Sequence, residues 1–323
     1  SIEAPSALSN AVSSVFGLPR PSVKSASNFS SNSTAPAVQE HCQGFLTARW
    51  GESVVNQPTL NGDNQSAGKD IYALVILNTN CCGDSFERLW SLSTFRICAD
   101  GGANRLYDMV VKLARKRGEN PKELVRKYVP DVIKGDLDSL RPDVGSFYQS
   151  LGTRIIRDRD QSCNDFYKAL SELRSMQLEQ YPLSRMTVMA LGAFGGRFDQ
   201  EMAAINALYE WDQVFERLLL LSEQNLGFLL SPGRHRVVPN TLVEGPTCGL
   251  LPVGGACRGV TTRGLKWDLK DQVLRFGGLV SSSNRLAAKV VEVQTRDPLL
   301  WMSEIKPESW AKLAAAYSNG AAG

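Results

Sequence analysis

Apolar residues become regularly spaced from Ile71 onward, where short apolar runs alternate with stretches of helical periodicity. The apolar runs predict buried strands at residues 72–77, 95–99, 131–134, 154–156, 186–191 and 218–221. Between the runs, apolar residues recur at intervals of three and four, as Ala103, Leu106 and Val110 do, which predicts amphipathic helices. This alternation is typical of a three-layer α/β domain with helices on the faces of a parallel sheet. We expect that domain to span residues 71–232.

The pattern changes after Pro232, where helical periodicity stops. Short β-like segments separated by Gly, Pro and Asn follow, at residues 235–238, 249–253, 260–267, 273–276 and 290–295. This spacing predicts an all-β sandwich or barrel domain over residues 233–306. Residues 307–323 are expected to form a C-terminal tail with one short amphipathic helix. Residues 1–70 are rich in Ser, Asn and Pro and lack periodicity, which predicts a disordered or low-complexity extension.

Composition excludes several classes of protein. The 36 basic and 33 acidic residues are scattered, which does not indicate a nucleic-acid-binding surface. No apolar run approaches the roughly 20 residues that span a bilayer. Seven cysteines without a CxxC pair favour free thiols and the cytoplasm, although the basic first 35 positions leave organelle targeting as an alternative. With only two histidines, the chemistry must rest mainly on carboxylates.

Polar and glycine-rich segments follow the predicted strands of the α/β domain. They are Asp100-Gly101-Gly102, residues 135–139, residues 158–161 and residues 192–196. Ligands of open α/β sheets bind beyond the carboxyl ends of the strands. We therefore expect these four segments to meet at one rim of the sheet.

Asp136 and Asp138 are two residues apart, so an extended backbone would direct both carboxylates to the same side. Carboxylates are ligands that Mg²⁺ prefers, and this pair predicts a metal site. The alternative is a turn with a helix cap ahead of Arg141-Pro142.

Two glycine pairs could bring backbone N–H groups to phosphate oxygens: Gly101 with Gly102, and Gly195 with Gly196. Neither belongs to a GxxxxGK[ST] or GxGxxG motif. Arg197 could neutralise a phosphate, whereas Asp199 also suits the first turn of a helix. In the β domain, Trp267 is either a core residue or a platform for a cationic aromatic ring.

Four motifs together resemble the eukaryotic thiamine pyrophosphokinases in order and spacing. They are Ala99-Asp100-Gly101-Gly102-Ala103-Asn104-Arg105-Leu106-Tyr107, Gly135-Asp136-Leu137-Asp138-Ser139, Gly195-Gly196-Arg197-Phe198-Asp199-Gln200 and Gly264-Leu265-Lys266-Trp267. The similarity covers roughly residues 71–306. It implies magnesium-dependent transfer of a pyrophosphoryl group from ATP to the hydroxyl of thiamine, which yields thiamine diphosphate and AMP. It also implies a homodimer in which an α/β domain of one subunit and a β-sandwich domain of the other enclose thiamine.

The resemblance assigns roles to individual residues. It implies that the metal and the triphosphate are held by Asp100, Asp136 and Asp138. The resemblance implies that the nucleotide is bound by Gly101, Gly102, Arg105, Gly195, Gly196 and Arg197, together with Asp199. Near thiamine and its reacting hydroxyl it places Gln161, Asn164 and Asp165. Trp267 would lie against the thiamine rings, and Ser283 and Asn284 would line that pocket.

One loop departs from the family pattern. Where the family usually has Asp-Gln-Asp-x-Thr-Asp, this chain has Asp160-Gln161-Ser162-Cys163-Asn164-Asp165, so one acid and one hydroxyl are missing. We expect substrate affinity to be tuned by this change. Two alternatives remain at this point: a magnesium-dependent nucleotide or diphosphate hydrolase on the same carboxylates, and a thiamine-binding sensor without catalysis.

Overall fold

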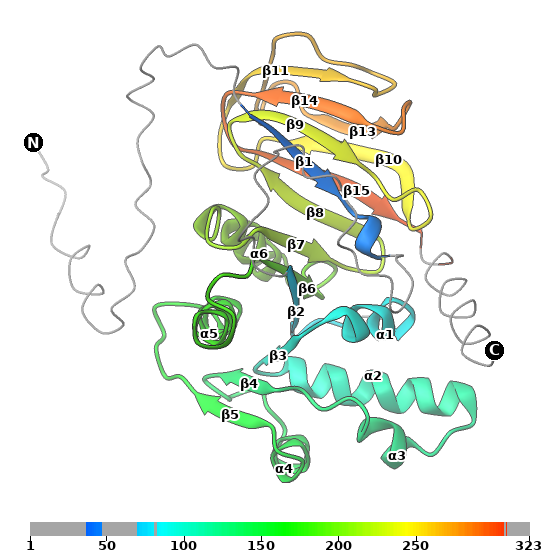
Figure 1. Ribbon diagram of the computed structural model, residues 1–323, viewed down its shortest axis with the longest axis vertical. Helices are drawn as coiled ribbons and strands as arrows, with labels where there is room; N and C mark the ends of the chain where they lie inside the picture. The colour runs from blue at the N-terminus through cyan, green and yellow to red at the C-terminus, as the bar shows by residue number, and fades with distance from the viewer. Residues whose placement is uncertain (1–36, 47–69, 81–82, 307, 309–323) are drawn as a thin grey trace, which may run out of the picture. The chain divides into compact units, whose positions relative to one another are not determined.

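The computed structural model describes residues 37–46, 70–80, 83–306 and 308. The larger of its two sheets has ten strands (Figure 1). Its strands, in spatial order, are β13 (Ser281–Arg285), β10 (Glu244–Leu251), β15 (Leu299–Ile305), β8 (Asn225–Leu230), β7 (Arg217–Leu221), β6 (Met186–Leu191), β2 (Ile71–Ile76), β3 (Phe95–Ala99), β4 (Val132–Gly135) and β5 (Arg154–Arg157). A second sheet has the order β1 (Val38–Cys42), β9 (Gly233–Val238), β14 (Val291–Thr295), β11 (Cys257–Arg263) and β12 (Gln272–Leu274).

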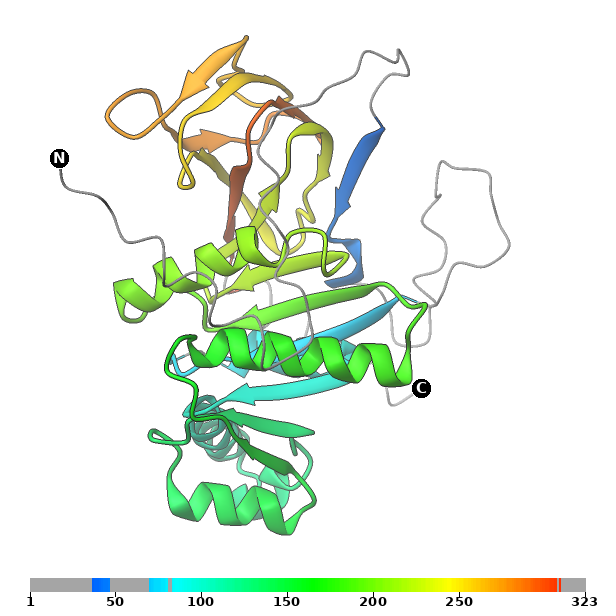
Figure 2. The same ribbon diagram turned by 90° about the vertical axis from the view of Figure 1, so that its left-hand side faces the viewer.

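The six strands from β7 to β5 are parallel, and helices cover both of their faces. The helices are α1 (Gly83–Leu92), α2 (Gly102–Arg117), α3 (Pro121–Val125), α4 (Pro142–Ser150), α5 (Asp165–Gln180) and α6 (Phe198–Glu210). Leu74 and Ile133 pack with α1 to α4, whereas their strand neighbours Ala73 and Val132 pack with α5 and α6. This division follows from the alternation of side chains along a strand. The predicted three-layer α/β architecture is confirmed (Figure 2).

Local signals explain where several helices begin and end. Gly118 ends α2 at a φ of 69°, in the left-handed region that glycine adopts readily. Asn120 and Pro121 begin α3, because the Asn120 side chain accepts a hydrogen bond from the backbone nitrogen of Lys122. Asn164 begins α5 in the same way, and its Oδ1 accepts a hydrogen bond from the backbone nitrogen of Tyr167 at 2.8 Å. The last of these caps fixes the start of a helix that contributes to the candidate site.

The remaining strands of the large sheet pair antiparallel and face the five-stranded sheet. Phe228, Leu250 and Trp301 of the large sheet belong to the same buried cluster as Val237 and Val260 of the smaller sheet. The predicted β-sandwich is therefore confirmed. The large sheet contains strands from both sides of residue 232. The division into separate domains at that residue therefore stays a prediction.

The structure differs from the sequence-based expectation in the N-terminal extension. Residues 38–46 were expected to lack structure, which is wrong, because they form β1 and the 3-10 helix η1 (Gly44–Leu46). β1 pairs parallel with β9, and Nε2 of His41 lies 3.0 Å from Nδ1 of His235. The rest of the extension that was expected to be disordered, and the predicted C-terminal helix, lie outside the described residues.

Three further strands were missed. β13 was expected to be a plain turn, and no strand was predicted at β8 or β15. Among the helices that the structure describes, none is both long and apolar enough to cross a membrane.

Candidate active site

Parallel pairing brings the carboxyl ends of β2, β3, β4, β5 and β6 to one rim of the sheet. β2 lies between β3 and β6, so the chain proceeds in opposite directions along the sheet from the two sides of β2. Such a switch point opens a crevice for ligands in α/β sheets. The four segments that were expected to meet at one rim follow β3, β4, β5 and β6, as predicted.

Three aspartates converge at this rim. Asp100 follows β3, Asp136 follows β4 and Asp165 begins α5, and one carboxylate oxygen from each lies within 4.8 Å of the others. The backbone nitrogen of Asp136 donates a hydrogen bond to Oδ1 of Asp165 at 3.3 Å. Asp100 is 3% exposed, and its Oδ2 accepts a hydrogen bond from the backbone nitrogen of Ser139 at 3.1 Å. Its Oδ1 is buried without a hydrogen-bond partner in the structure.

Close backbone approach explains the glycines beside these aspartates. A Cβ on Gly102 would lie 2.1 Å from the carbonyl oxygen of Ile76. A Cβ on Gly135 would lie 2.7 Å from Cβ of Asp100 and 3.0 Å from Oδ1 of Asp165. Both positions lack room for a larger residue, so packing requires glycine at each of them. Contact of Gly101 and Gly102 with phosphate stays a prediction.

Burial and hydrogen bonding act in opposite directions on the three carboxylates. Burial raises the pKa of Asp100 and the pKa of Asp165 above the ordinary value, and each is raised further by a neighbouring aspartate. Hydrogen bonds from the Gln161 side chain and from the backbone of Asp138 lower the pKa of Asp136. A cluster of three carboxylates in which Asp100 keeps an unpartnered buried oxygen fits a hard divalent cation such as Mg²⁺.

Asp138 lies outside this cluster. Its pairing with Asp136 was predicted from an extended backbone. That prediction is wrong, because Leu137 between them has a φ of 65°. Asp138 is exposed, and its Oδ1 accepts a hydrogen bond from Oγ of Ser139 at 2.9 Å. The alternative of a helix cap is not observed either, since α4 begins after Arg141 without a side-chain cap.

The loop after β5 reaches the cluster through one side chain. Nε2 of Gln161 donates a hydrogen bond to Oδ2 of Asp136 at 3.2 Å. Asn164 uses its side chain to cap α5, although it is exposed at the rim. Asn164 therefore fills a capping position that threonine, the usual family residue, can also fill.

The backbone N–H groups of the glycine turn after β6 are hydrogen-bonded to a carboxylate of the same chain. The backbone nitrogens of Gly195 and Gly196 both donate hydrogen bonds to Oε1 of Glu201, at 2.9 and 3.1 Å. Arg197 and Asp199 are exposed and pair with each other, with Nε and Oδ1 3.1 Å apart. The turn and Arg197 lie at the expected rim. A phosphate bound there would replace Glu201 as the acceptor for the glycine N–H groups and Asp199 as the partner of Arg197.

In the β-sandwich, Trp267 is 53% exposed, so its reading as a core residue is wrong. Nζ of Lys266 lies 4.5 Å from the centroid of its ring. Asn284 is buried, accepts a hydrogen bond from the backbone nitrogen of Trp267 at 3.3 Å and donates one to its carbonyl oxygen at 2.9 Å. Asn284 therefore positions residues 264–267, the tryptophan loop. Ser283 instead lines an open hollow of about 530 Å³, together with residues that include Ser282 and Met302.

Sequence reasoning missed two groups at the rim. The first is the pair Asn78 and Asn80, which follow β2, and that position after a strand was the available signal. Their Oδ1 atoms accept hydrogen bonds from Nε and Nη1 of Arg105, a predicted site residue, both at 2.9 Å. Lys168 is the second group, with a side chain 2% exposed and an ion pair to Asp165. Its signal was a lysine next to the buried stripe of α5.

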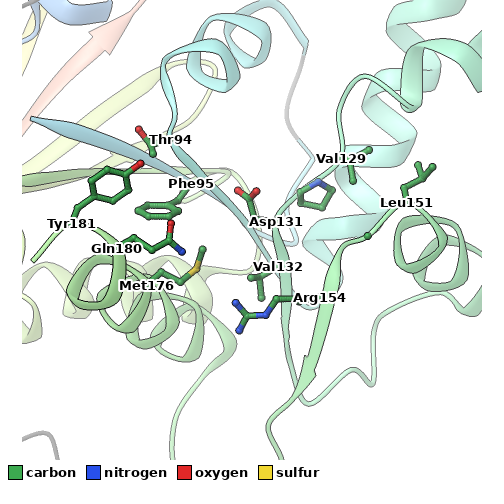
Figure 3. Close-up of a pocket in the computed structure, with 12 residues that line it drawn as sticks. Thr94, Phe95, Val129, Asp131, Val132, Leu151, Arg154, Met176, Gln180 and Tyr181 are labelled. Carbon is green, nitrogen blue, oxygen red and sulfur yellow. The ribbon is translucent and has the colours of Figure 1, made fainter.

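A second hollow, of about 420 Å³, lies at the opposite ends of the strands (Figure 3). Its lining includes Phe95 at the start of β3, Asp131 just before β4 and Arg154 at the start of β5. Oδ2 of Asp131 accepts a hydrogen bond from the backbone of Arg96, and Arg154 pairs with Glu172. Because those charges already have partners, we assign no function to this hollow.

Comparison with known proteins identifies relatives over nearly all of the two-part fold. Residues 86–220 match the family model of the thiamin pyrophosphokinase catalytic domain, and residues 234–300 match that of the thiamin pyrophosphokinase vitamin B1 binding domain. Thiamine pyrophosphokinase 2 of Arabidopsis thaliana is 42% identical over 237 residues, which are 73% of this chain and 86% of the relative. The crystal structure of yeast thiamin pyrophosphokinase matches with a TM-score of 0.69 and 26% identity, over 85% of this chain and 93% of that one. The Candida albicans enzyme matches with a TM-score of 0.67 and 26% identity, over 84% and 95% of the two chains.

Proposed function

The chain belongs to the thiamine pyrophosphokinase family, and on that premise we propose that it transfers the pyrophosphoryl group of ATP to the hydroxyl of thiamine. The observation that carries the assignment of the site is the convergence of Asp100, Asp136 and Asp165 within 4.8 Å at the switch point of the sheet. ATP and thiamine are then its substrates, and thiamine diphosphate and AMP its products.

We propose that these three aspartates hold Mg²⁺, with the unpartnered Oδ1 of Asp100 as one ligand. Bound Mg²⁺ would neutralise charge on the triphosphate. Gln161 keeps Asp136 in place by its hydrogen bond at 3.2 Å. Asp138 lies outside the three-aspartate cluster, so its assignment as a ligand has no support from the geometry.

Asp165 is the carboxylate that we propose to orient the thiamine hydroxyl. The hydroxyl oxygen forms a bond to the β-phosphorus of ATP, the bond from that phosphorus to the α,β-bridging oxygen breaks, and AMP leaves. The hydroxyl proton passes to a base. Arg105, Arg197 and the glycine turns are proposed to contact the nucleotide.

We further propose a homodimer with an active site shared between subunits. Seven strand-to-strand steps of about 4.8 Å separate β3 from β13, or roughly 34 Å along the sheet. Trp267 is tied to β13 through Asn284, so it lies far from Asp100 within one chain. One thiamine molecule is too small to contact both, whereas a second subunit could bring its tryptophan to the acidic rim.

The cytoplasm is the compartment we propose. Cys163, Cys248 and Cys257 carry free thiols, and burial raises their pKa values to about 11, 12 and 11. Neutral thiols of this kind suit a reducing compartment.

The experiment that tests the activity mixes the purified protein with ATP, thiamine and Mg²⁺ and quantifies thiamine diphosphate and AMP, with each component omitted in turn. Equal amounts of both products, dependent on all three additions, are expected. AMP formed without thiamine would indicate a hydrolase. Thiamine binding without either product would indicate a sensor.

A further inference from the structure

Lys168 is a buried cation beside the acidic cluster. It is the fourth residue of α5, and its side chain is 2% exposed. Nζ donates a hydrogen bond to the carbonyl oxygen of Asp158 at 3.0 Å and another to Oδ1 of Asp165 at 3.4 Å.

Helix formation and core packing both disfavour a lysine at this place. An ammonium group near a helix N-terminus interacts unfavourably with the helix dipole. A buried ammonium group is costly unless it is paired and hydrogen-bonded. The neighbours Phe166, Ala169 and Leu170 are buried apolar residues, as expected for a core-facing turn. The two acceptors of Lys168 are therefore what makes the position tolerable.

Those acceptors stand at the two ends of one loop. Asp158 follows β5 and Asp165 begins α5, so the lysine joins both ends of residues 159–164. From inside this loop, Gln161 donates to Oδ2 of Asp136. Within the described residues, both hydrogen bonds that the Asp165 carboxylate accepts end on Oδ1. Its Oδ2 is left for a ligand.

We propose that Lys168 is a positioning residue for this reaction. By joining the Asp158 carbonyl to the Asp165 carboxylate, it holds the loop closed and keeps Oδ2 of Asp165 directed to the cation and the thiamine hydroxyl. The inference rests on the proposed function, because it takes the three aspartates as the cation site.

Replacement of Lys168 by Met tests this role, since Met keeps most of the apolar stem and removes the donor. Lys134→Met is the matched control: Lys134 is 12% exposed and pairs with Glu172 of α5 at 3.0 Å, and Glu172 keeps Arg154 as a partner at 2.8 Å. Binding of Mg²⁺ and Mn²⁺ to the protein without substrates is measured by calorimetry and by Mn²⁺ paramagnetic resonance. Thermal unfolding, kcat and the KM values for ATP and thiamine are measured alongside.

The sign of the change in cation affinity is decisive. Loss of a residue that orients a ligand weakens metal binding about tenfold to hundredfold. Loss of a mere neighbouring positive charge would tighten it, because a repulsive interaction is removed. We expect weaker binding and a lower kcat in Lys168→Met, and wild-type cation affinity in Lys134→Met. Unchanged or tighter binding in Lys168→Met would overturn the proposal, even if its melting temperature fell.

A double-mutant cycle with Asp165→Asn covers the case in which Lys168→Met folds poorly. If Lys168 acts through Asp165, Lys168→Arg lowers the cation affinity of the otherwise wild-type protein only in part, because it keeps a donor, and changes nothing further in the Asp165→Asn background. Equal effects of Lys168→Arg in both backgrounds would contradict the mechanism. Cation binding is read without substrates, so it is independent of the activity assay. A wild-type protein that binds cation but forms no thiamine diphosphate would overturn the proposed function, whereas the effect of Lys168→Met on cation affinity would still decide whether Lys168 positions the Asp165 carboxylate.

Discussion

The acidic rim and the tryptophan loop are built in contrasting ways. At the rim, Asp100 is 3% exposed and Gly135 packs against it so closely that a Cβ has no room. In the loop, Trp267 is 53% exposed and is held through its backbone by Asn284. The three aspartates of the rim are thus brought together within one chain, whereas the tryptophan presents an exposed ring. This difference agrees with the proposal that a second subunit covers the tryptophan.

The largest effect is expected from Asp136→Asn, which removes a charge from the cluster while keeping its shape. Turnover should fall by about a thousandfold, because charge stabilisation at the phosphates is lost. The melting temperature should change little, since Asp136 is only partly buried. Product formation and thermal unfolding are measured together.

Asp138→Asn is the matched comparison, because Asp138 is exposed and outside the cluster. It should lose less than about tenfold in turnover, in line with a residue away from the charge-stabilising groups. Equal losses in both variants would restore the original assignment of Asp138 to the metal.

Gly135→Ala tests how rigidly the rim is built. A Cβ would lie 2.7 Å from Cβ of Asp100, so the two strands must shift apart beside the cluster. A displacement of about 1 Å in a catalytic group can lower kcat by about a hundredfold. Gly118→Ala is the control, because it strains a left-handed residue far from the site, with open space around it. It should lower the free energy of unfolding by about 1 kcal/mol and leave kcat intact. Similar kcat values in both variants would show that the rim tolerates movement.

Trp267→Ala tests the open region. Loss of a desolvated contact between the ring and the thiazolium cation, worth about 2 kcal/mol, should raise the KM for thiamine roughly thirtyfold. Phe276→Ala is the control, since Phe276 is 64% exposed in the same part of the chain. A KM that rises equally in both would mean that the tryptophan has no special role.

Mixing two variants extends this test to the shared site. In a mixed dimer of Asp136→Asn and Trp267→Ala subunits, one site contains both changes and the other contains neither. Random exchange should therefore return about a quarter of wild-type activity at low thiamine. Activity that stays at the mean of the separate variants would place both residues in the site of one chain.

The same contrast explains what could be predicted from sequence. The parallel strands were recognised because both of their faces are buried, which produces continuous apolar runs such as residues 186–191. β13 has the sequence Ser-Ser-Ser-Asn-Arg, and no apolar pattern marks it as a strand. β1 lies in a segment of low-complexity composition, and only its pairing with β9 reveals it.

Within the site, the glycines and aspartates that follow strands were predictable from position. The exclusion of Asp138 was not, because a φ of 65° at Leu137 cannot be read from a two-residue spacing. Asp165 joined the cluster through the placement of α5 beside the end of β4, a tertiary contact that the local sequence does not record. Lys168 was missed although both of its partners are near in sequence, because the local pattern does not show that its side chain is buried against them.

The smallest effect concerns the attachment of β1 to β9, to which half-buried His41 and buried His235 contribute a hydrogen-bonded pair. Nε2 of His235 donates to the carbonyl oxygen of Ser231 at 2.7 Å, so its Nδ1 accepts from His41. Burial, with His235 and Arg217 nearby, lowers the pKa of His41 from 6.5 to about 3, and burial also lowers the pKa of His235 despite Asp212.

The sign of the pH dependence follows from these pKa values. The folded chain keeps His41 neutral down to about pH 3, whereas the unfolded chain binds a proton below about pH 6.5. The free energy of unfolding should therefore fall as pH decreases through this window, by about 1.4 kcal/mol at pH 5.5 for one histidine. His41→Gln keeps a donor for Nδ1 of His235 and removes one titrating group. Urea unfolding between pH 7.5 and 4.5 should give a shallower decline in this variant. If the free energy of unfolding fell with the same slope in the wild type and in His41→Gln, β1 would detach without affecting the stability of the rest of the sandwich.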